Sequence, residues 1–154
     1  MKYVVCDIPL AIIISYKRLK KAFPNKKISI LFDENSITEL EKAILENDIS
    51  FIFPHQMKDI QNKFIDLTLA IDCIHEMDKK TIKYYFHQIN KFSNLFYFSV
   101  WKKTIVLHSG IFAKNSNRLD YYSNDYPVPD NWKKTFEEDL IFPSNFIGVG
   151  FKLN

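Results

Sequence analysis

Alternation of strand-like and helix-like segments is the feature that most constrains the fold of this chain. Short runs of β-branched and aromatic residues are separated by stretches with apolar residues at helical spacing. We predict strands at Tyr3–Cys6, Ile28–Phe32, Ile49–Phe53, Ile65–Ile71, Leu95–Val100 and Thr104–Phe112. We predict helices at 9–23, 36–47, 57–63, 79–92 and 132–140. Repeated alternation of this kind is typical of a doubly wound α/β sheet.

Three of the predicted helices carry recognisable start signals. Pro9 suits the first turn of a helix, because its fixed φ and missing N–H have no cost there. Ser36 and Glu39 form the S-x-x-E pattern of a capping box. Asp78 has the side chain of an N-cap and directly precedes the helix predicted at 79–92. These signals fix where the helices begin and therefore where the strands before them end.

The second half of the chain predicts a change in sheet organisation. The segment Ile65–Ile71 is apolar at positions on both faces, which is typical of a strand in the middle of a parallel sheet. Residues 113–131 are rich in Asn, Ser, Asp, Pro and Tyr, and we expect an irregular excursion there. The last strand alternates Ile147, Val149, Phe151 and Leu153. Late strands without long helices between them predict an antiparallel edge.

Composition fits one domain spanning residues 1–154. The chain is 47% hydrophobic and 16% aromatic, which is enough to bury a sizeable core. No apolar run reaches the roughly 18 residues that a membrane helix needs. The N-terminus lacks the features of a signal peptide, since Asp7 and Pro9 interrupt its apolar stretch. Cys6 and Cys73 are therefore expected to be buried free thiols in a reducing cytoplasm.

The net charge of +3 does not indicate a nucleic-acid partner. A basic cluster lies between Lys17 and Lys27, but a solvated helix face followed by a lysine-rich loop accounts for it equally well. No aromatic stacking motif accompanies this cluster. We therefore do not expect nucleic-acid binding.

Glycine is scarce, and this limits how a cofactor can be held. The chain has 3 glycines, and the first of them is Gly110. Glycine lets the backbone approach a nucleotide or a phosphate closely, and none is available in the first two thirds of the chain. P-loops and G-x-S-x-G nucleophile turns are also absent from the sequence.

Ligands of doubly wound sheets lie at the carboxyl ends of the strands, so polar residues at those ends are the candidates. Asp7 ends the first predicted strand and could accept hydrogen bonds from both hydroxyls of a ribose, or serve as a helix N-cap before Pro9. His55 and Gln56 follow the third strand. They could contact an adenine edge, or simply solvate the strand end. The residues alone leave both pairs of alternatives open.

The densest candidate cluster is Asp72 to Asp78, directly after the fourth strand. His75 beside Glu76 could form a general-base pair, since histidine titrates near neutral pH. Asp72 belongs to the same cluster, and hydrogen bonding at the helix entry is the structural alternative for these three side chains. A zinc H-E-x-x-H motif would need a histidine where the chain has Lys79, so we predict no metal site.

Several stretches, taken in order, resemble a bacterial sugar O-methyltransferase family of class I, S-adenosyl-L-methionine (SAM)-dependent enzymes. Val5-Cys6-Asp7-Ile8-Pro9 is similar to the "v-D-L-P" at the end of the family's second strand. The others are the Tyr16–Pro24 helix, Phe64–Leu67 leading to Ile74-His75-Glu76-Met77, Tyr84–Ile89 before the aromatic strand Phe96–Phe98, and Tyr126-Pro127 with Trp132. The resemblance covers nearly the whole chain.

The resemblance implies an incomplete Rossmann-like, class I methyltransferase sheet in three layers with an antiparallel C-terminal edge. It implies that Asp7 binds the SAM ribose, with Ile8 beside it in the cofactor site, and that His55 and Gln56 lie near the adenine. Asp72 and the catalytic pair His75 and Glu76 would lie where the methionine part of SAM meets a sugar or glycan acceptor. His75 would take the proton of the acceptor hydroxyl.

Two departures from the family pattern bear on activity. The family has an Asn after its fifth strand, where this chain has Ser99-Val100-Trp101-Lys102. The family's first strand and its G-x-G loop precede the "D-L-P" segment, and Met1 stands only six residues before Asp7. That first strand lies between the family's second and fourth strands. We therefore expect unpaired strand edges and poor SAM binding by the chain alone.

The unpaired edges predict association, with a second copy or with a complementing chain that supplies the missing part. The alternative function is a non-catalytic α/β binding or assembly domain derived from a methyltransferase.

Overall fold

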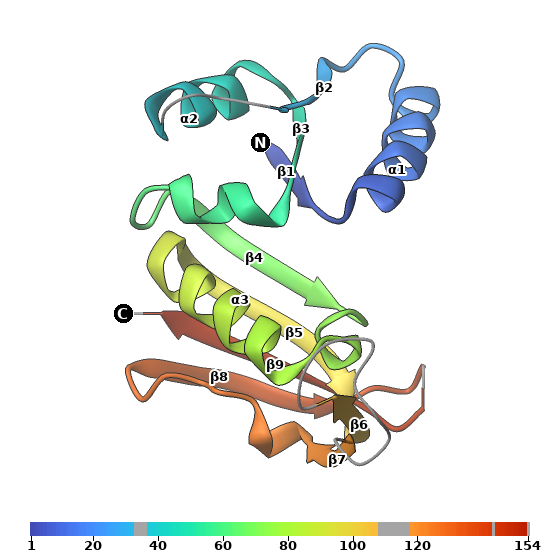
Figure 1. The fold of residues 1–154 in the computed structure, drawn as a ribbon, viewed down its shortest axis with the longest axis vertical. Coiled ribbons are helices and arrows are strands. Elements are labelled where there is room, and N and C mark those ends of the chain that lie inside the picture. Colours follow the sequence, from blue (N-terminus) through green and yellow to red (C-terminus); the bar gives the residue numbers. More distant parts are fainter. Residues whose placement is uncertain (33–36, 108–117, 143, 154) are drawn as a thin grey trace. The chain divides into compact units, whose positions relative to one another are not determined.

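The computed structural model describes residues 1–32, 37–107, 118–142 and 144–153 (Figure 1). The chain divides into two compact units, Met1–Gln61 and Asn62–Asn154. Each unit has its own sheet, and each is described by itself below. The single domain expected over residues 1–154 stays a prediction.

The first unit is a small parallel sheet with helical connections. Its strand order is β1 (Tyr3–Cys6), β3 (Ile49–Ile52), β2 (Ile28–Ile30), and both pairings are parallel. The connections contain α1 (Pro9–Ala22) and α2 (Ile37–Glu46). These elements confirm the predicted alternation of strands and helices along the chain. In place of the short helix predicted at 57–63, the 3₁₀ helix η1 (Pro54–Asp59) begins directly after β3.

A compact apolar core explains why these segments form their elements. Ile12 of α1 is 1% exposed and packs with Ile28, Ile49 and Phe51 of the strands. Pro9 occupies the first turn of α1 as predicted. Ser36, half of the predicted capping box, lies outside the described residues, although α2 begins at the next position.

The second unit contains a four-stranded mixed sheet in the order β4 (Ile65–Ile71), β5 (Ser93–Trp101), β9 (Phe146–Leu153), β8 (Trp132–Asp139). β4 and β5 are parallel, whereas β9 is antiparallel to both β5 and β8. A separate antiparallel hairpin joins β6 (Lys103–Leu107) to β7 (Arg118–Tyr122). The short 3₁₀ helices are η2 (Ile74–Glu76) and η4 (Ser123–Asp125). The predicted antiparallel C-terminal edge is therefore confirmed.

Helix α3 (Lys79–Phe92) lies along one face of this sheet (Figure 1). The Asp78 carboxylate accepts a hydrogen bond from the Thr81 N–H at 2.8 Å, which confirms the predicted N-cap. Phe86 of α3 packs among the rings of Phe96, Phe98 and Trp132, with centroid distances of 5.6 to 5.8 Å. Phe86, Phe96 and Phe98 are each 1% exposed, so these rings bury nearly all of their apolar surface.

On the opposite face of the sheet, the edge formed by β4 is apolar and exposed. Leu67, Leu69 and Ile71 of β4 are 49 to 60% exposed, and Leu95 of β5 is 43% exposed. Among the described residues, β4 pairs with β5 on one side and has no neighbour on the other. The prediction that Ile65–Ile71 lies in the middle of a parallel sheet is therefore wrong for this unit. The large apolar side chains Leu67, Leu69 and Ile71 share one face of the strand, and that face is exposed.

Two late segments are strands where other structure was expected. Residues 132–140 were predicted as a helix because Trp132, Phe136 and Leu140 are spaced by four. They form β8, which pairs antiparallel with β9 and has an irregularity between Lys134 and Phe136. That irregularity lets Trp132 face the core while Phe136 stacks on Tyr97 at 5.9 Å.

The irregular excursion predicted at 113–131 contains β7, whose pairing with β6 the composition did not reveal. Of the strand predicted at Thr104–Phe112, residues 108–112 lie outside the described part. The fold class shown is mixed α/β with open sheets. No helix in the described part of the chain is long and apolar enough to cross a membrane.

Candidate functional site

The first unit brings its predicted cofactor residues to the carboxyl ends of two neighbouring strands. Asp7 follows β1, and its N–H donates to the Ile52 carbonyl at the end of β3 at 3.4 Å. The Asp7 carboxylate accepts a hydrogen bond from the Ile8 N–H at 2.8 Å. The residue in the N-cap position of α1 is Ile8, and its side chain makes no capping hydrogen bond. The N-cap alternative for Asp7 is therefore wrong, and its second carboxylate oxygen has no partner among the described residues.

His55 and Gln56 lie in η1, after β3, and their environments differ. The Gln56 side chain is buried, and its oxygen accepts from the Phe53 N–H at 2.8 Å while its amide donates to the Phe32 carbonyl at 3.2 Å. Both ends of this amide are thus used by the backbone, so Gln56 positions the strand end. His55 is exposed and its ring stacks on Phe53 at 5.9 Å. Of the two, His55 is the side chain that can reach a ligand.

In the second unit the candidate residues follow β4. Asp72 has a φ of 55°, in the left-handed region that aspartate tolerates better than most residues. Its N–H donates to the Ser99 carbonyl at the end of β5, at 3.1 Å. The chain thus turns sharply at the carboxyl ends of the parallel pair and enters η2, which contains His75 and Glu76.

His75 is the most buried of the candidate side chains in this unit, at 6% exposed. Its Nε2 lies 3.3 Å from the carboxylate of Asp72, and its ring packs edge-on against Trp101 and Phe146. Burial lowers the pKa of His75, and the nearby charges of Asp72 and Glu76 oppose that shift. This shift favours the neutral imidazole, the form in which a histidine can accept a proton.

The burial of His75 also restricts what it can reach. Its Nδ1 is buried without a hydrogen-bond partner among the described residues, and its Nε2 faces Asp72. Asp72 is more than half exposed and Glu76 is exposed. The carboxylates of Asp72 and Glu76 are therefore the groups of this cluster that a ligand can reach directly.

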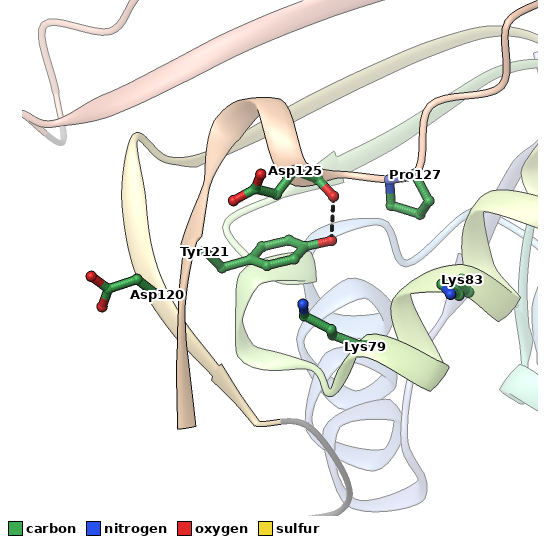
Figure 2. A pocket seen from close by; sticks show the side chains of 6 residues that line it. All are labelled: Lys79, Lys83, Asp120, Tyr121, Asp125 and Pro127. Carbon is green, nitrogen blue, oxygen red and sulfur yellow. Dashed lines mark hydrogen bonds between the residues drawn. The ribbon is translucent and has the colours of Figure 1, made fainter. Parts of the chain in front are cut away.

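A hollow of about 430 Å³ lies beside the start of α3 (Figure 2). Its lining residues come from α3, β7, η4 and the segment after η4: Lys79, Lys83, Asp120, Tyr121, Asp125 and Pro127. The Lys79 ammonium lies 5.1 Å from the centroid of the Tyr121 ring. Strand β6, the hairpin partner of β7, contacts η2, although none of Asp72, His75 and Glu76 lines the hollow.

Hydrogen bonds hold the far wall of this hollow in place. The Tyr121 hydroxyl donates to the Asp125 carbonyl at 2.6 Å, and the Asp125 carboxylate accepts from the Tyr122 N–H at 2.7 Å. Burial raises the pKa of the Tyr121 hydroxyl, which keeps it protonated as a donor. Asp120 forms an ion pair with Lys103 at 2.7 Å. Both acidic residues of the wall thus have partners of their own.

The sequence did not single out these lining residues as a site. For Lys79 and Lys83 the sequence pattern predicts only a helix. Asp120, Tyr121 and Asp125 lie in the predicted irregular excursion. One available signal was the start of α3, where no acidic residue lies in the first turn but lysines occupy positions 79, 80 and 83. Lysine is unusual there, because the positive end of a helix favours acids.

Metal chemistry has no donor set in the described part of the chain. No three side chains of His, Cys, Asp or Glu come together there in an arrangement that could hold an ion.

Comparison with known proteins shows the fold class. No family model matches the chain, and no curated protein matches it. Among solved structures, the chain is similar to the PH0226 protein from Pyrococcus horikoshii OT3, with a TM-score of 0.54 and 11% sequence identity. The match covers 100% of this chain and 83% of that one. At this identity the likeness concerns the α/β fold alone.

The residues present fit part of a SAM site. Asp7 has a free carboxylate oxygen at the carboxyl end of a parallel sheet, which suits the two hydroxyls of a ribose. Exposed His55 follows the adjacent strand. Gln56 does not fit an adenine contact, because the backbone already uses its amide.

Proposed function

We propose that this chain is a SAM-dependent O-methyltransferase-like domain that acts on a sugar or glycan hydroxyl in the cytoplasm and needs a further strand and glycine-rich loop for activity. One observation carries the proposal. By the resemblance, β1 and β4 correspond to the family's second and fourth strands, which flank its first strand. Among the described residues, each of them has a partner on one side only in its own sheet.

This pattern matches what removal of the flanked strand would leave. In the first unit β1 pairs with β3 alone, and in the second unit β4 pairs with β5 alone. An unpaired row of N–H and C=O groups on a parallel strand is unfavourable unless another strand covers it. The supply of that strand, by a complementing chain or by preceding polypeptide, belongs to the proposal.

When bound, SAM supplies a methyl group on its sulfonium. In the proposed role, Asp7 holds the ribose through its free carboxylate oxygen, Ile8 lies beside it, and His55 approaches the adenine. Asp72 orients His75 through the contact at 3.3 Å. His75 accepts the proton of the acceptor hydroxyl by way of Asp72, or exposed Glu76 accepts it directly.

Calorimetric titration with SAM tests this function. We expect the chain alone to bind SAM weakly, and we expect micromolar binding once a family strand–G-x-G–helix segment is fused before Met1. Asp7→Ala in the extended protein should abolish that binding, whereas the exposed Asp130→Ala control should leave it unchanged. Absence of SAM binding by the extended, folded protein would refute the proposal. Micromolar binding by the chain alone would show that the loop is dispensable.

The alternative, a non-catalytic assembly domain, is favoured by the open apolar row Leu67, Leu69 and Ile71 on β4. It predicts association of the chain without SAM binding in either form of the protein. The same calorimetry, combined with light scattering, separates the two functions.

A further inference from the structure

We propose that the hollow at the start of α3 binds the anionic group of an acidic acceptor sugar, a carboxylate or a phosphate, through Lys79 and Lys83. The inference rests on the proposed function in taking the bound sugar to be the methyl acceptor. The preference for an anionic group rests on the geometry of the hollow. Its lining places both lysines on one side and the wall of Tyr121, Asp125 and Pro127 on the other (Figure 2). A volume of about 430 Å³ is within the range of small-molecule sites.

The two lysines are uncompensated. Lys79 and Lys83 are one helical turn apart on α3, and neither has a carboxylate partner among the described residues. Like charges at this spacing repel each other. A bound anion would remove that repulsion and provide the missing counter-charge.

The helix itself adds to the preference for an anion. Lys79 is the first residue of α3, where the helix dipole is positive and disfavours cations, and Lys83 lies one turn further on. The first turn contains no acidic residue, and the Asp78 carboxylate is engaged with the Thr81 N–H as the cap. Repulsion between the lysines and repulsion from the dipole therefore act together, and one anion relieves both.

The acidic residues of the lining offset little of this positive charge. Asp120 is paired with Lys103 at 2.7 Å, and the Asp125 carboxylate accepts the Tyr122 N–H. In Figure 2 both carboxylates point away from the lysines. Lys79 extends toward the Tyr121 ring, so its ammonium stands at the wall of the hollow.

The position of the hollow connects it with the proposed chemistry. Lys79 follows directly after Asp78, at the end of the segment that contains Asp72, His75 and Glu76. Asp120 and Tyr121 belong to β7, and its hairpin partner β6 contacts η2. An acidic group anchored at the lysines would place the rest of a sugar ring beside that segment.

The test is a titration of the ¹⁵N-labelled chain, without SAM, with glucuronate, glucose 6-phosphate, glucose and inorganic phosphate, followed by NMR. We expect saturable shifts of the amides at 79–83 with the two acidic sugars and none with glucose. The two acidic arms identify whether carboxylate or phosphate is preferred. Lys79→Gln and Lys83→Gln should each weaken binding about fivefold or more, the loss expected for one charge-assisted contact.

Lys80→Gln is the matched control, because it removes the same charge from an exposed position of the same turn. Equal weakening by Lys80→Gln would overturn the site in favour of diffuse charge. Glucose binding as tightly as the acidic sugars, or phosphate as tightly as glucose 6-phosphate, would overturn the acidic-sugar assignment. Thermal unfolding of each variant verifies that it is folded.

The outcome is independent of the methyltransferase proposal. Acidic-sugar binding without SAM binding by the extended protein would keep this site and refute the transferase. SAM binding by the extended protein without any preference for acidic sugars would support the transferase and refute this site.

Discussion

At the scale of single residues, His75 shows how burial sets chemistry. Its ring is enclosed by Trp101 and Phe146, and this desolvation lowers its pKa despite two nearby carboxylates. The sequence correctly predicted that Asp72, His75 and Glu76 follow the fourth strand together. It could not predict that His75 turns inward, because His75 is enclosed by rings from β5 and β9, which lie 26 and 71 positions further along the chain.

The lowered pKa of His75 predicts a pH-dependent stability. Unfolding exposes the imidazole and restores its ordinary pKa of about 6.5, so the unfolded state gains the proton first as the pH falls. The contribution of neutral His75 to the free energy of unfolding is therefore full well above pH 6.5. It is lost as the pH falls through that value and then through the lower pKa of the folded state. We expect the free energy of unfolding, measured with urea, to fall between about pH 7.5 and pH 5.5 by at most about 1.4 kcal/mol per pH unit for this group.

His75→Gln should reduce that decline, since glutamine can still face Asp72 but does not titrate. Its absolute stability will differ, so the comparison concerns the slope alone. An unchanged slope in the variant would assign the pH dependence to other groups.

At Gly150, the ring of Phe136 lies very close to the backbone of β9. A Cβ at this position of β9 would collide with the ring of Phe136, which stacks on Tyr97 across the glycine. We expect Gly150→Ala to destabilise the protein by about 1 to 3 kcal/mol, the usual range for overpacking. Thermal unfolding checks this. In a Phe136→Ala background the same substitution should cost much less, and an equal cost in both backgrounds would contradict the explanation.

At the scale of elements, local signals predicted helices well and late strands poorly. Pro9 and Asp78 fixed the starts of α1 and α3, because their effects are confined to one turn. The helix predicted at 132–140 was wrong. Spacing by four at Trp132 and Phe136 fits a helix, and it also fits a strand with an irregularity between the two residues. Only the partner strand β9 decides between these, and it lies further along the chain. The hollow was missed because four of its six lining residues come from β7 and the segments after it, far along the chain from α3.

The start of α3 carries a prediction about stability. Lys83→Gln removes the repulsion with Lys79 at helical spacing, so in the absence of ligand it should raise the free energy of unfolding by about 0.2 to 0.5 kcal/mol. Urea unfolding in low salt measures it. Added salt should shrink the difference, because screening weakens the repulsion in the parent chain. A decrease in stability would mean that Lys83 makes a favourable contact.

At the scale of the whole molecule, two compact units with separate cores imply separate responses to core damage. Ile12 is 1% exposed in the core of the first unit. We expect Ile12→Ala to reduce hydrogen-exchange protection, measured by mass spectrometry, throughout residues 1–61 and to affect 62–153 much less. Phe86→Ala should give the opposite pattern. Uniform loss of protection in either variant would show a single cooperative unit.

The edge strand β4 has a consequence for how this polypeptide behaves in concentrated solution. In its sequence, Ile-Asp-Leu-Thr-Leu-Ala-Ile, the leucines and isoleucines lie symmetrically about Thr68. Two chains meeting antiparallel there would set Leu67 against Leu69 and Ile65 against Ile71. No proline, lysine or bulge within β4 discourages such an encounter. Without a covering strand, the purified polypeptide should therefore become turbid or form β-rich assemblies as its concentration rises, and a charged residue at Leu69 should keep it clear.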